Sequence, residues 1–286
     1  MSDATLATFA ASLAMSLPDR TLVADRRERV FELLQKAGTG AWLMFESGSF
    51  SHGTAIPVHS DVDYMARTDL DNKPSLPSTA LRRVKAALAD ASDIRSARIS
   101  SPAVKVQFWT PPDFEVAPAF YERKSGDDEV FHIAGPNEEW VLSAPTAHNR
   151  YVSTQNDRLG KKAKPLIRLL KAWKYHTGTP ISSTYLELRT AQYLAVESSV
   201  IYDIDLRVMF SKMLAGGLAA MNDPLGIVTR IRPCSSEASR LASLAAMRRA
   251  LNALQEADLA KASADTTAYW VKMSGVFGSA YPWPSW

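Results

Sequence analysis

The sequence is poor in the residues that build disulfides, zinc sites and membrane spans. Cys234 is the one cysteine among 286 residues, so no disulfide can form within the chain, and a reducing, cytoplasmic setting is expected. The five histidines are scattered, without the close spacing of zinc ligands. No apolar run is long enough to span a bilayer, and the N-terminus lacks the pattern of a secretory signal. We therefore expect no membrane partner.

The chain also lacks a strong excess of charge. Lys and Arg number 33 and Asp and Glu number 30, which gives a formal net charge of +3. A protein that wraps nucleic acid usually carries a larger basic excess, so we expect no long nucleic acid partner. A small anionic ligand is compatible with this charge.

The two halves of the sequence have different patterns. The first half mixes two amphipathic helices, predicted over about 5–36 and 78–91, with short strands at about 41–45, 61–66, 104–109, 114–117, 130–133 and 140–142. The second half is rich in alanine and leucine, and helices are predicted over about 165–176, 184–196, 199–214 and 235–262. The pattern predicts an α+β fold with one unit over 1–157 and a helical unit over 158–286.

A pair of carboxylates is the most informative motif. Asp61 and Asp63 share one side of a predicted strand, and Val62 faces the other side. Neighbouring carboxylates repel each other unless a cation lies between them, and Mg²⁺ prefers oxygen ligands while keeping positions for water or phosphate. A third acid is expected from another strand, where Glu115 is favoured and Asp113 is the reserve. These residues predict a magnesium site.

A glycine–serine turn, Gly48-Ser49, precedes the acidic pair in the sequence. A glycine turn lets the backbone approach a phosphate closely, and the Ser49 hydroxyl and nearby N–H groups can donate to it. Each motif alone is common: Gly-Ser is an ordinary turn, and Asp-x-Asp occurs on solvated strand edges. Their combination with a third acidic strand favours a metal and nucleotide site.

A basic segment follows in the second half. Between 158 and 174 the sequence has seven lysines and arginines and no acid, and Lys164, Arg168 and Lys171 share a helical face. This face could hold a triphosphate, or it could be a solvated basic surface.

A serine-rich turn follows the basic segment. Thr184 and Glu187 fit a capping box, which predicts a helix start. The Ser183 hydroxyl and the first-turn N–H groups could bind phosphate. Tyr185 could stack on a base or belong to the core.

Taken in order, these segments resemble the bacterial cGAS/DncV-like nucleotidyltransferases (CD-NTases), the SMODS-type cyclic oligonucleotide synthases of antiphage CBASS systems. These are relatives of cyclic GMP–AMP synthase and oligoadenylate synthase. The resemblance rests on Gly48-Ser49, Asp61-Val62-Asp63, Glu115–Phe120, Trp140 with Pro145 and His148, the segments 166–174 and 183–187, Asn222-Asp223-Pro224 and Val276–Pro282. The third acid of the family is often Asp, and here it is Glu115.

The resemblance implies a bilobed DNA polymerase beta-like nucleotidyltransferase core with a helical C-terminal lobe and an active site between the lobes. It implies template-independent synthesis of a cyclic di- or oligonucleotide from nucleoside triphosphates such as ATP and GTP, and a downstream effector that responds to the product. Two Mg²⁺ ions, with Mn²⁺ as the alternative, would be held by Asp61, Asp63 and Glu115.

Under the same hypothesis the donor triphosphate would contact Ser49, Lys171 and Ser183, beside Gly48. Two other functions are compatible with these motifs. One is a transferase that adds nucleotides to an RNA or protein acceptor, which the weak net charge disfavours for long RNA. The other is a non-catalytic nucleotide-binding module, which the presence of all three acids disfavours.

Overall fold

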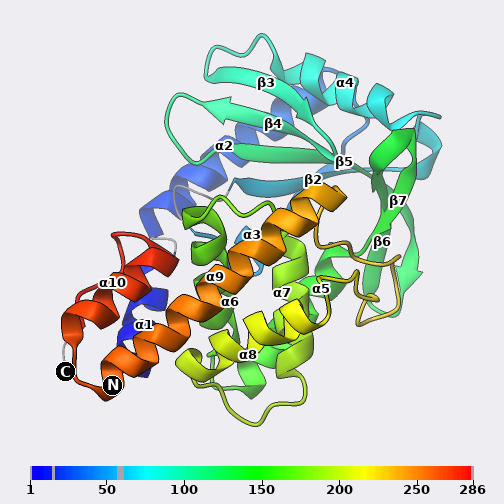
Figure 1. Cartoon of the computed structure of the whole chain (residues 1–286). Helices are drawn as coiled ribbons and strands as arrows, with labels where there is room; N and C mark the ends of the chain where they lie inside the picture. Colours follow the sequence, from blue (N-terminus) through cyan, green and yellow to red (C-terminus); the bar gives the residue numbers. More distant parts are fainter. Residues whose placement is uncertain (1, 15–16, 57–60, 285–286) are drawn as a thin grey trace. The chain divides into compact units, whose positions relative to one another are not determined.

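The computed structural model describes residues 2–14, 17–56 and 61–284 (Figure 1), and the chain divides into two compact units. The sheet unit comprises Met15–Arg150 and Leu225–Thr229. The helical unit comprises Met1–Ala14, Tyr151–Pro224 and Arg230–Trp286. This division departs from the predicted 1–157 and 158–286: the N-terminal segment joins the helical unit, and 225–229 joins the sheet unit. Within the described ranges, no helix combines the length and the apolar character that a membrane crossing requires.

The sheet unit is built around a seven-stranded sheet with the order β1-β2-β5-β4-β3, in which β6 pairs with β5 and β7 pairs with β6. Its strands are β1 (Leu43–Ser47), β2 (Val62–Thr68), β3 (Ile94–Ser100), β4 (Ala103–Phe108), β5 (Phe114–Ser125), β6 (Asp128–Ala134) and β7 (Trp140–Ser143). The β2–β5 pair is parallel, and the other pairs are antiparallel. The two strands that carry the predicted acids are therefore direct neighbours.

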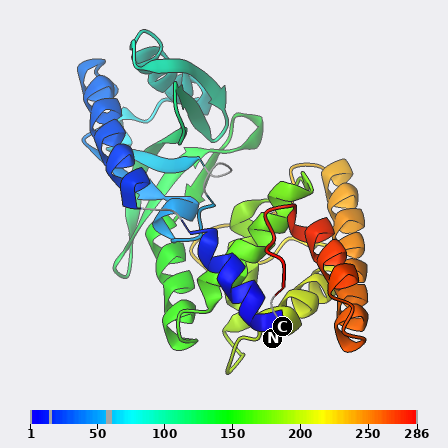
Figure 2. The same cartoon turned by 90° about the vertical axis from the view of Figure 1, so that its left-hand side faces the viewer.

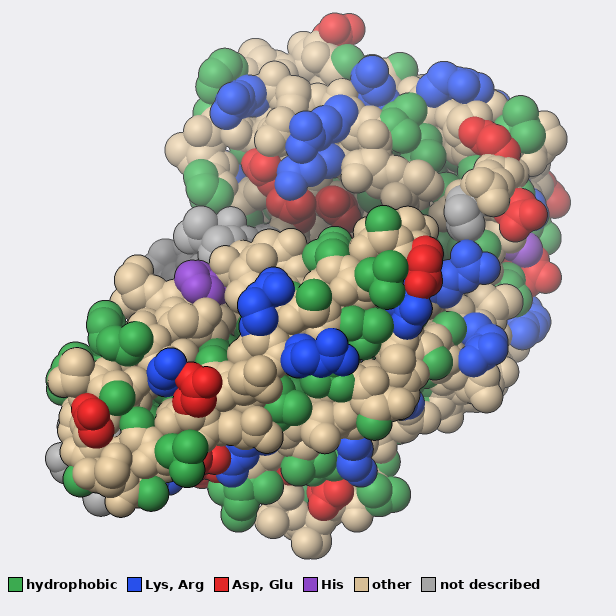
Figure 3. All heavy atoms as spheres, in the orientation of Figure 1, with side chains coloured by type: hydrophobic (Ala, Val, Ile, Leu, Met, Phe, Trp, Pro, Cys, Tyr) green, Lys and Arg blue, Asp and Glu red, His purple; other side chains and the backbone are tan. Residues whose placement is uncertain are grey.

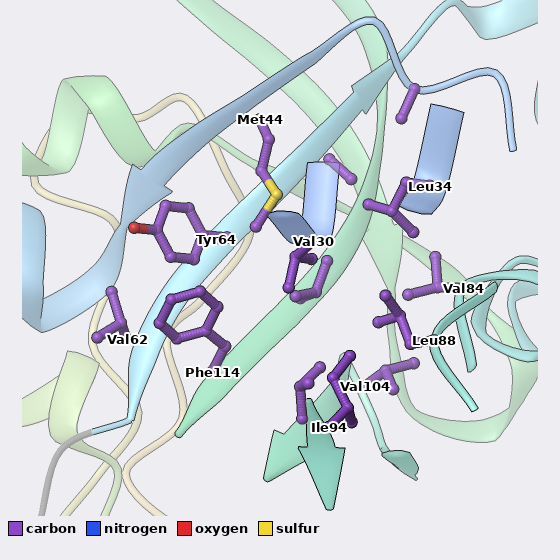
Figure 4. Packing of buried hydrophobic residues seen from close by; sticks show 14 of the residues in the cluster. Val30, Leu34, Met44, Val62, Tyr64, Val84, Leu88, Ile94, Val104 and Phe114 are labelled. Carbon is purple, nitrogen blue, oxygen red and sulfur yellow. The ribbon is translucent and has the colours of Figure 1, made fainter. Parts of the chain in front are cut away.

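Helices cover one face of this sheet. These helices are α2 (Leu17–Lys36) and α4 (Pro77–Leu88). The unit also contains the short elements α3 (Gly48–Ser51), η1 (Leu70–Asn72) and η2 (Pro136–Glu138). The helix α5 (Pro145–Arg158) begins in this unit and ends in the other. Figure 4 shows apolar side chains of α2, α4 and the strands pointing toward one another in a shared core. The helix predicted over 5–36 is instead two helices, because its first part is a separate element of the other unit.

The helical unit contains α1 (Ser2–Ser12), α6 (Ala163–His176), α7 (Ser183–Leu194), α8 (Tyr202–Ala215), α9 (Glu237–Ala262) and α10 (Thr266–Phe277). The long α9 and the C-terminal α10 run side by side in Figures 1 and 2. The Trp173 and Phe210 rings pack edge to face with centroids 4.8 Å apart. Phe9 of α1 packs against Phe277 and Tyr281, at 5.6 and 5.3 Å between ring centroids. The N-terminal helix is thus held by the C-terminal end of the chain.

Candidate functional site

A row of polar residues crosses one face of the sheet. Strand register places Ser47 opposite Asp63, Asp63 opposite Glu115, Glu115 opposite Lys105, and Lys105 opposite Arg98. Directly opposed residues of a sheet lie on the same face, with Cβ atoms about 5 Å apart. The row therefore runs across five strands as a hydroxyl, two carboxylates and two cations.

Strand alternation puts this row on the face away from the main core. Val62 and Tyr64 flank Asp63, and Val104 and Val106 flank Lys105; all four are buried in the main core. Figure 4 labels Val62, Tyr64 and Val104 there. Because successive side chains of a strand point to opposite faces, burying these neighbours turns the charged residues outward. The predicted alternation around Asp63 is confirmed, and the same alternation applies to Lys105.

Asp61 lies just before β2 and contacts a cation. The N–H of Val62 donates to the carbonyl of Asp113 at 2.8 Å, which anchors the start of β2 beside β5. The Asp61 Oδ2 atom lies 2.5 Å from Lys105 Nζ, and their side chains are 26% and 21% exposed. In Figure 3, acidic side chains gather beside basic ones on the sheet unit. Lys105, which sequence reasoning missed, therefore belongs to the acidic site.

Asp113, the reserve for the third acid, has a local role. Its carboxylate accepts hydrogen bonds from the backbone N–H of Phe108 at 3.1 Å and from the Gln107 side chain at 3.4 Å. These hydrogen bonds stabilise the turn between β4 and β5. Glu115 is the residue that register places opposite Asp63, which supports it as the third acid.

The glycine–serine turn lies against Asp63. Gly48 begins α3 with φ +57°, and a Cβ added to it would come within 2.1 Å of Asp63 Oδ2. The backbone N–H of Ser49 lies 3.4 Å from the same oxygen. A residue with a side chain would be strained by the backbone angle and would collide with the carboxylate. The turn at Gly48 and the Asp63 carboxylate therefore pack directly against each other.

The donor set fits a hard divalent cation in type. Asp61, Asp63 and Glu115 offer carboxylate oxygens, which Mg²⁺ prefers. Within 2–14, 17–56 and 61–284, no three His, Cys, Asp or Glu side chains are gathered closely enough to hold a metal ion together. The Asp61 carboxylate contacts Lys105, so Asp61 would have to turn toward Asp63 and Glu115 for the three acids to bind one cation together.

In the helical unit, Lys171 lies inside the fold. Its side chain is 0% exposed, and its Nζ donates to Glu187 Oε1 at 2.9 Å. Arg168 donates from Nε to the carbonyl of Ala10 at 2.9 Å. Two of the three cations on the predicted face of α6, Lys171 and Arg168, therefore make contacts within the helical unit. Most apolar residues of α6 are buried as well. The structure does not place Lys171 at a surface where it could contact a phosphate directly.

The predicted helix start is confirmed at α7, but its capping residue differs from the prediction. Its cap is Ser182, whose hydroxyl accepts from the N–H of Tyr185 at 3.2 Å, so the capping box of Thr184 and Glu187 is wrong. Glu187 is instead drawn into the pair with Lys171. The Ser183 hydroxyl accepts from Lys174 Nζ at 2.6 Å.

Tyr185 is a core residue. Its ring is buried, and its hydroxyl donates to the carbonyl of Ala219 at 3.0 Å. Burial raises the pKa of this phenol. The structure therefore supports a core position for Tyr185 and not stacking on a base.

Two comparisons with known proteins agree with this geometry. The family model described as the Second Messenger Oligonucleotide or Dinucleotide Synthetase domain matches residues 1–156, which include the whole acidic row and the glycine–serine turn. This match confirms the resemblance seen in the sequence. No curated protein sequence matches the chain.

Solved structures share the fold. CdnC of Escherichia coli MS115-1, solved in a complex with HORMA-deltaN, is 20% identical over 97% of each chain, with a TM-score of 0.74. The CD-NTase CdnG of Bradyrhizobium diazoefficiens, solved with GTP, is 14% identical over 98% of this chain and 96% of CdnG, with a TM-score of 0.72. DncV of Vibrio cholerae, a cyclic AMP-GMP synthase, is 16% identical over 84% of this chain and 70% of DncV, with a TM-score of 0.66. The predicted α+β nucleotidyltransferase fold is confirmed.

Proposed function

Since the chain belongs to the Second Messenger Oligonucleotide or Dinucleotide Synthetase family, a family of nucleotidyltransferases, we propose that it joins nucleoside triphosphates into a cyclic di- or oligonucleotide without a template. The observation that carries the proposal is the pairing of Asp63 with Glu115 on neighbouring parallel strands, with Asp61 two residues before Asp63. Such a set of carboxylates suits a reaction in which the substrate, a triphosphate, arrives with divalent cations.

The known ligands of similar proteins support this substrate class. CdnG was solved with GTP, and DncV was solved with the linear intermediate 5′ pppA(3′,5′)pG. By analogy, we propose ATP and GTP as substrates here and a linear product that is closed into a ring in a second step. We further propose that the product acts on a separate effector in cytoplasmic antiphage defence.

Nucleotidyltransferases typically need divalent metal ions. We propose that Asp61, Asp63 and Glu115 would hold two Mg²⁺ ions, or Mn²⁺; when bound, these ions would lower the pKa of the attacking ribose hydroxyl and neutralise the charge of the leaving pyrophosphate. Gly48 allows the chain to pass beside Asp63, and the Ser49 hydroxyl and N–H are proposed to orient the donor phosphates there.

From the helical unit, Ser183 is proposed as a phosphate contact, because its hydroxyl is already bonded to the Lys174 ammonium. For the buried Lys171 and Tyr185 we propose supporting roles. The Lys171–Glu187 pair holds α6 against α7, and Tyr185 anchors the first turn of α7, where Ser183 lies.

Product analysis tests the proposal. The purified protein is incubated with the four nucleoside triphosphates and Mg²⁺, and products are separated, treated with phosphatase and weighed by mass spectrometry. We expect pyrophosphate release and small phosphatase-resistant products without any added acceptor. Turnover that requires an RNA or protein acceptor would instead identify the acceptor transferase, and nucleotide binding without pyrophosphate release would identify a binding module.

The variants Asp63→Asn and Asp61→Asn test the site. Each removes a proposed metal ligand while keeping nearly the same side-chain shape, so circular dichroism should not change. Removing a residue that only hydrogen-bonds to a metal ligand already lowers metal affinity or activity by about 10–100-fold, so loss of a ligand itself should lower the rate by more than that. An Asn variant that retains wild-type turnover would contradict the assignment.

A further inference from the structure

Lys105 lies within the acidic site without having an assigned role. Its Nζ lies 2.5 Å from Asp61 Oδ2, and register places its Cα opposite that of Glu115. The residue thus bonds one proposed metal ligand and neighbours a second. Its position on β4, between the buried Val104 and Val106, fixes the side from which the ammonium reaches the carboxylates.

The pair of Lys105 and Asp61 is partly withdrawn from water, since less than a third of each side chain is exposed. Partly buried charges are screened less by salt than fully exposed ones. A divalent ion bound by Asp61 would use the same carboxylate group, and two cations brought together on one carboxylate repel each other. Binding of a metal ion by Asp61 should therefore weaken the contact between Asp61 and Lys105.

We propose that Lys105 is a built-in counter-ion of the metal site: it neutralises Asp61 and gives up this contact when a divalent cation binds. The proposal rests on the proposed function, because it concerns the same carboxylates. Lys105 is a positioning residue in this scheme. It holds Asp61 beside β4, and it sets the metal concentration at which the three carboxylates come together.

Arg98 provides a matched control. It follows Lys105 in the polar row, one strand farther from the carboxylates, and it is exposed on the edge strand β3. The variant Arg98→Gln removes the same formal charge as Lys105→Met but leaves the contact with Asp61 in place. The two variants therefore separate a specific ion pair from a general electrostatic effect.

The experiment measures Mn²⁺ binding to the full chain without nucleotide, by electron paramagnetic resonance of the unbound ion. We expect Lys105→Met to bind Mn²⁺ about tenfold more tightly than the wild type, since a cation beside the site is removed. Arg98→Gln should change the affinity by less than about threefold, because its charge is farther away and screened by solvent. Lys105→Arg, which keeps the charge, should bind like the wild type.

Several outcomes would overturn the inference: unchanged or weaker Mn²⁺ binding by Lys105→Met, an equal gain in Arg98→Gln, or no binding by any of the proteins. Circular dichroism reports the fold of each variant, and Lys105→Gln replaces the methionine variant if the latter does not fold. Pyrophosphate release by the wild type tests the proposed function independently. A wild type that turns over while Lys105→Met binds Mn²⁺ unchanged would refute the counter-ion role alone.

Discussion

Two lysine–carboxylate pairs in this molecule have opposite surroundings. In the sheet unit, Lys105 and Asp61 are 21% and 26% exposed, whereas in the helical unit Lys171 and Glu187 are 0% and 2% exposed. A carboxylate near the surface can exchange one cation for another at little cost in free energy, because water solvates the charges when the ion pair separates. A buried pair cannot, because separation leaves a charge without solvent. The comparison indicates an exchangeable ligand site in the sheet unit and a fixed structural contact in the helical unit.

Breaking the buried pair should have the largest effect on stability. Lys171→Met leaves Glu187 buried without its cation, so we expect a loss of about 3–5 kcal/mol in the free energy of unfolding. The measurement is urea unfolding followed by circular dichroism. The double variant Lys171→Met with Glu187→Met should recover most of the loss, since neither charge then remains inside.

Lys161→Met is the matched control for the buried pair. Lys161 pairs with Asp157 at an exposed position, and its removal should leave the urea midpoint unchanged. Should Lys171→Met prove as stable as Lys161→Met, the contrast between the two units would not hold.

Gly48→Ala should have the next largest effect, this time on turnover. The new Cβ would lie 2.1 Å from Asp63 Oδ2, so either the turn or the carboxylate must shift. Misplacement of a reacting group by about 1 Å can cost about 100-fold in rate, and we expect a loss of about 10–100-fold in pyrophosphate release.

Gly126→Ala separates the collision at Gly48 from backbone strain. Gly126 has φ +63° in the turn between β5 and β6, with nothing within 4 Å of an added Cβ. This variant carries the strain of the left-handed backbone, about 1–2 kcal/mol, without touching the acids. It should therefore keep wild-type turnover, and equal losses in the two variants would show that strain alone is responsible.

The smallest effect is expected at the start of α7. Ser182→Ala removes the hydroxyl that accepts from the N–H of Tyr185, at a cost of about 1 kcal/mol. Thr184→Ala, at the position that the sequence favours as the cap, should change the stability much less. Thermal unfolding of the two variants compares them directly, and a larger loss in Thr184→Ala would reverse the assignment of the cap.

Local patterns in the sequence predicted much of the site and little of its surroundings. The alternation around Asp63 and the turn at Gly48 are local features, and both are confirmed. The pairing of Lys105 with Asp61 depends on the register of β4 against β5, which no local pattern encodes. Lys105 could have been found as the charged residue between Val104 and Val106, had the order of the strands been known.

Errors in the helical unit have a tertiary origin. Helical spacing put Lys171 on a polar face with Lys164 and Arg168, but neighbouring helices bury most of α6, and Glu187 of α7 supplies the missing charge. The edge strand β3 was not predicted, because its exposed arginines, Arg95 and Arg98, interrupt the apolar pattern that is typical of a strand. Such charges are typical of edge strands, where they oppose pairing with another chain.

The division of the chain also limits how it can be cut. The backbone passes from one unit to the other after residues 14, 150, 224 and 229. A fragment that begins at residue 151 would lack α1, and the rings of Phe277 and Tyr281 would lose their partner Phe9. Segments of the two units alternate along the chain, so a single proteolytic cut cannot release either unit whole.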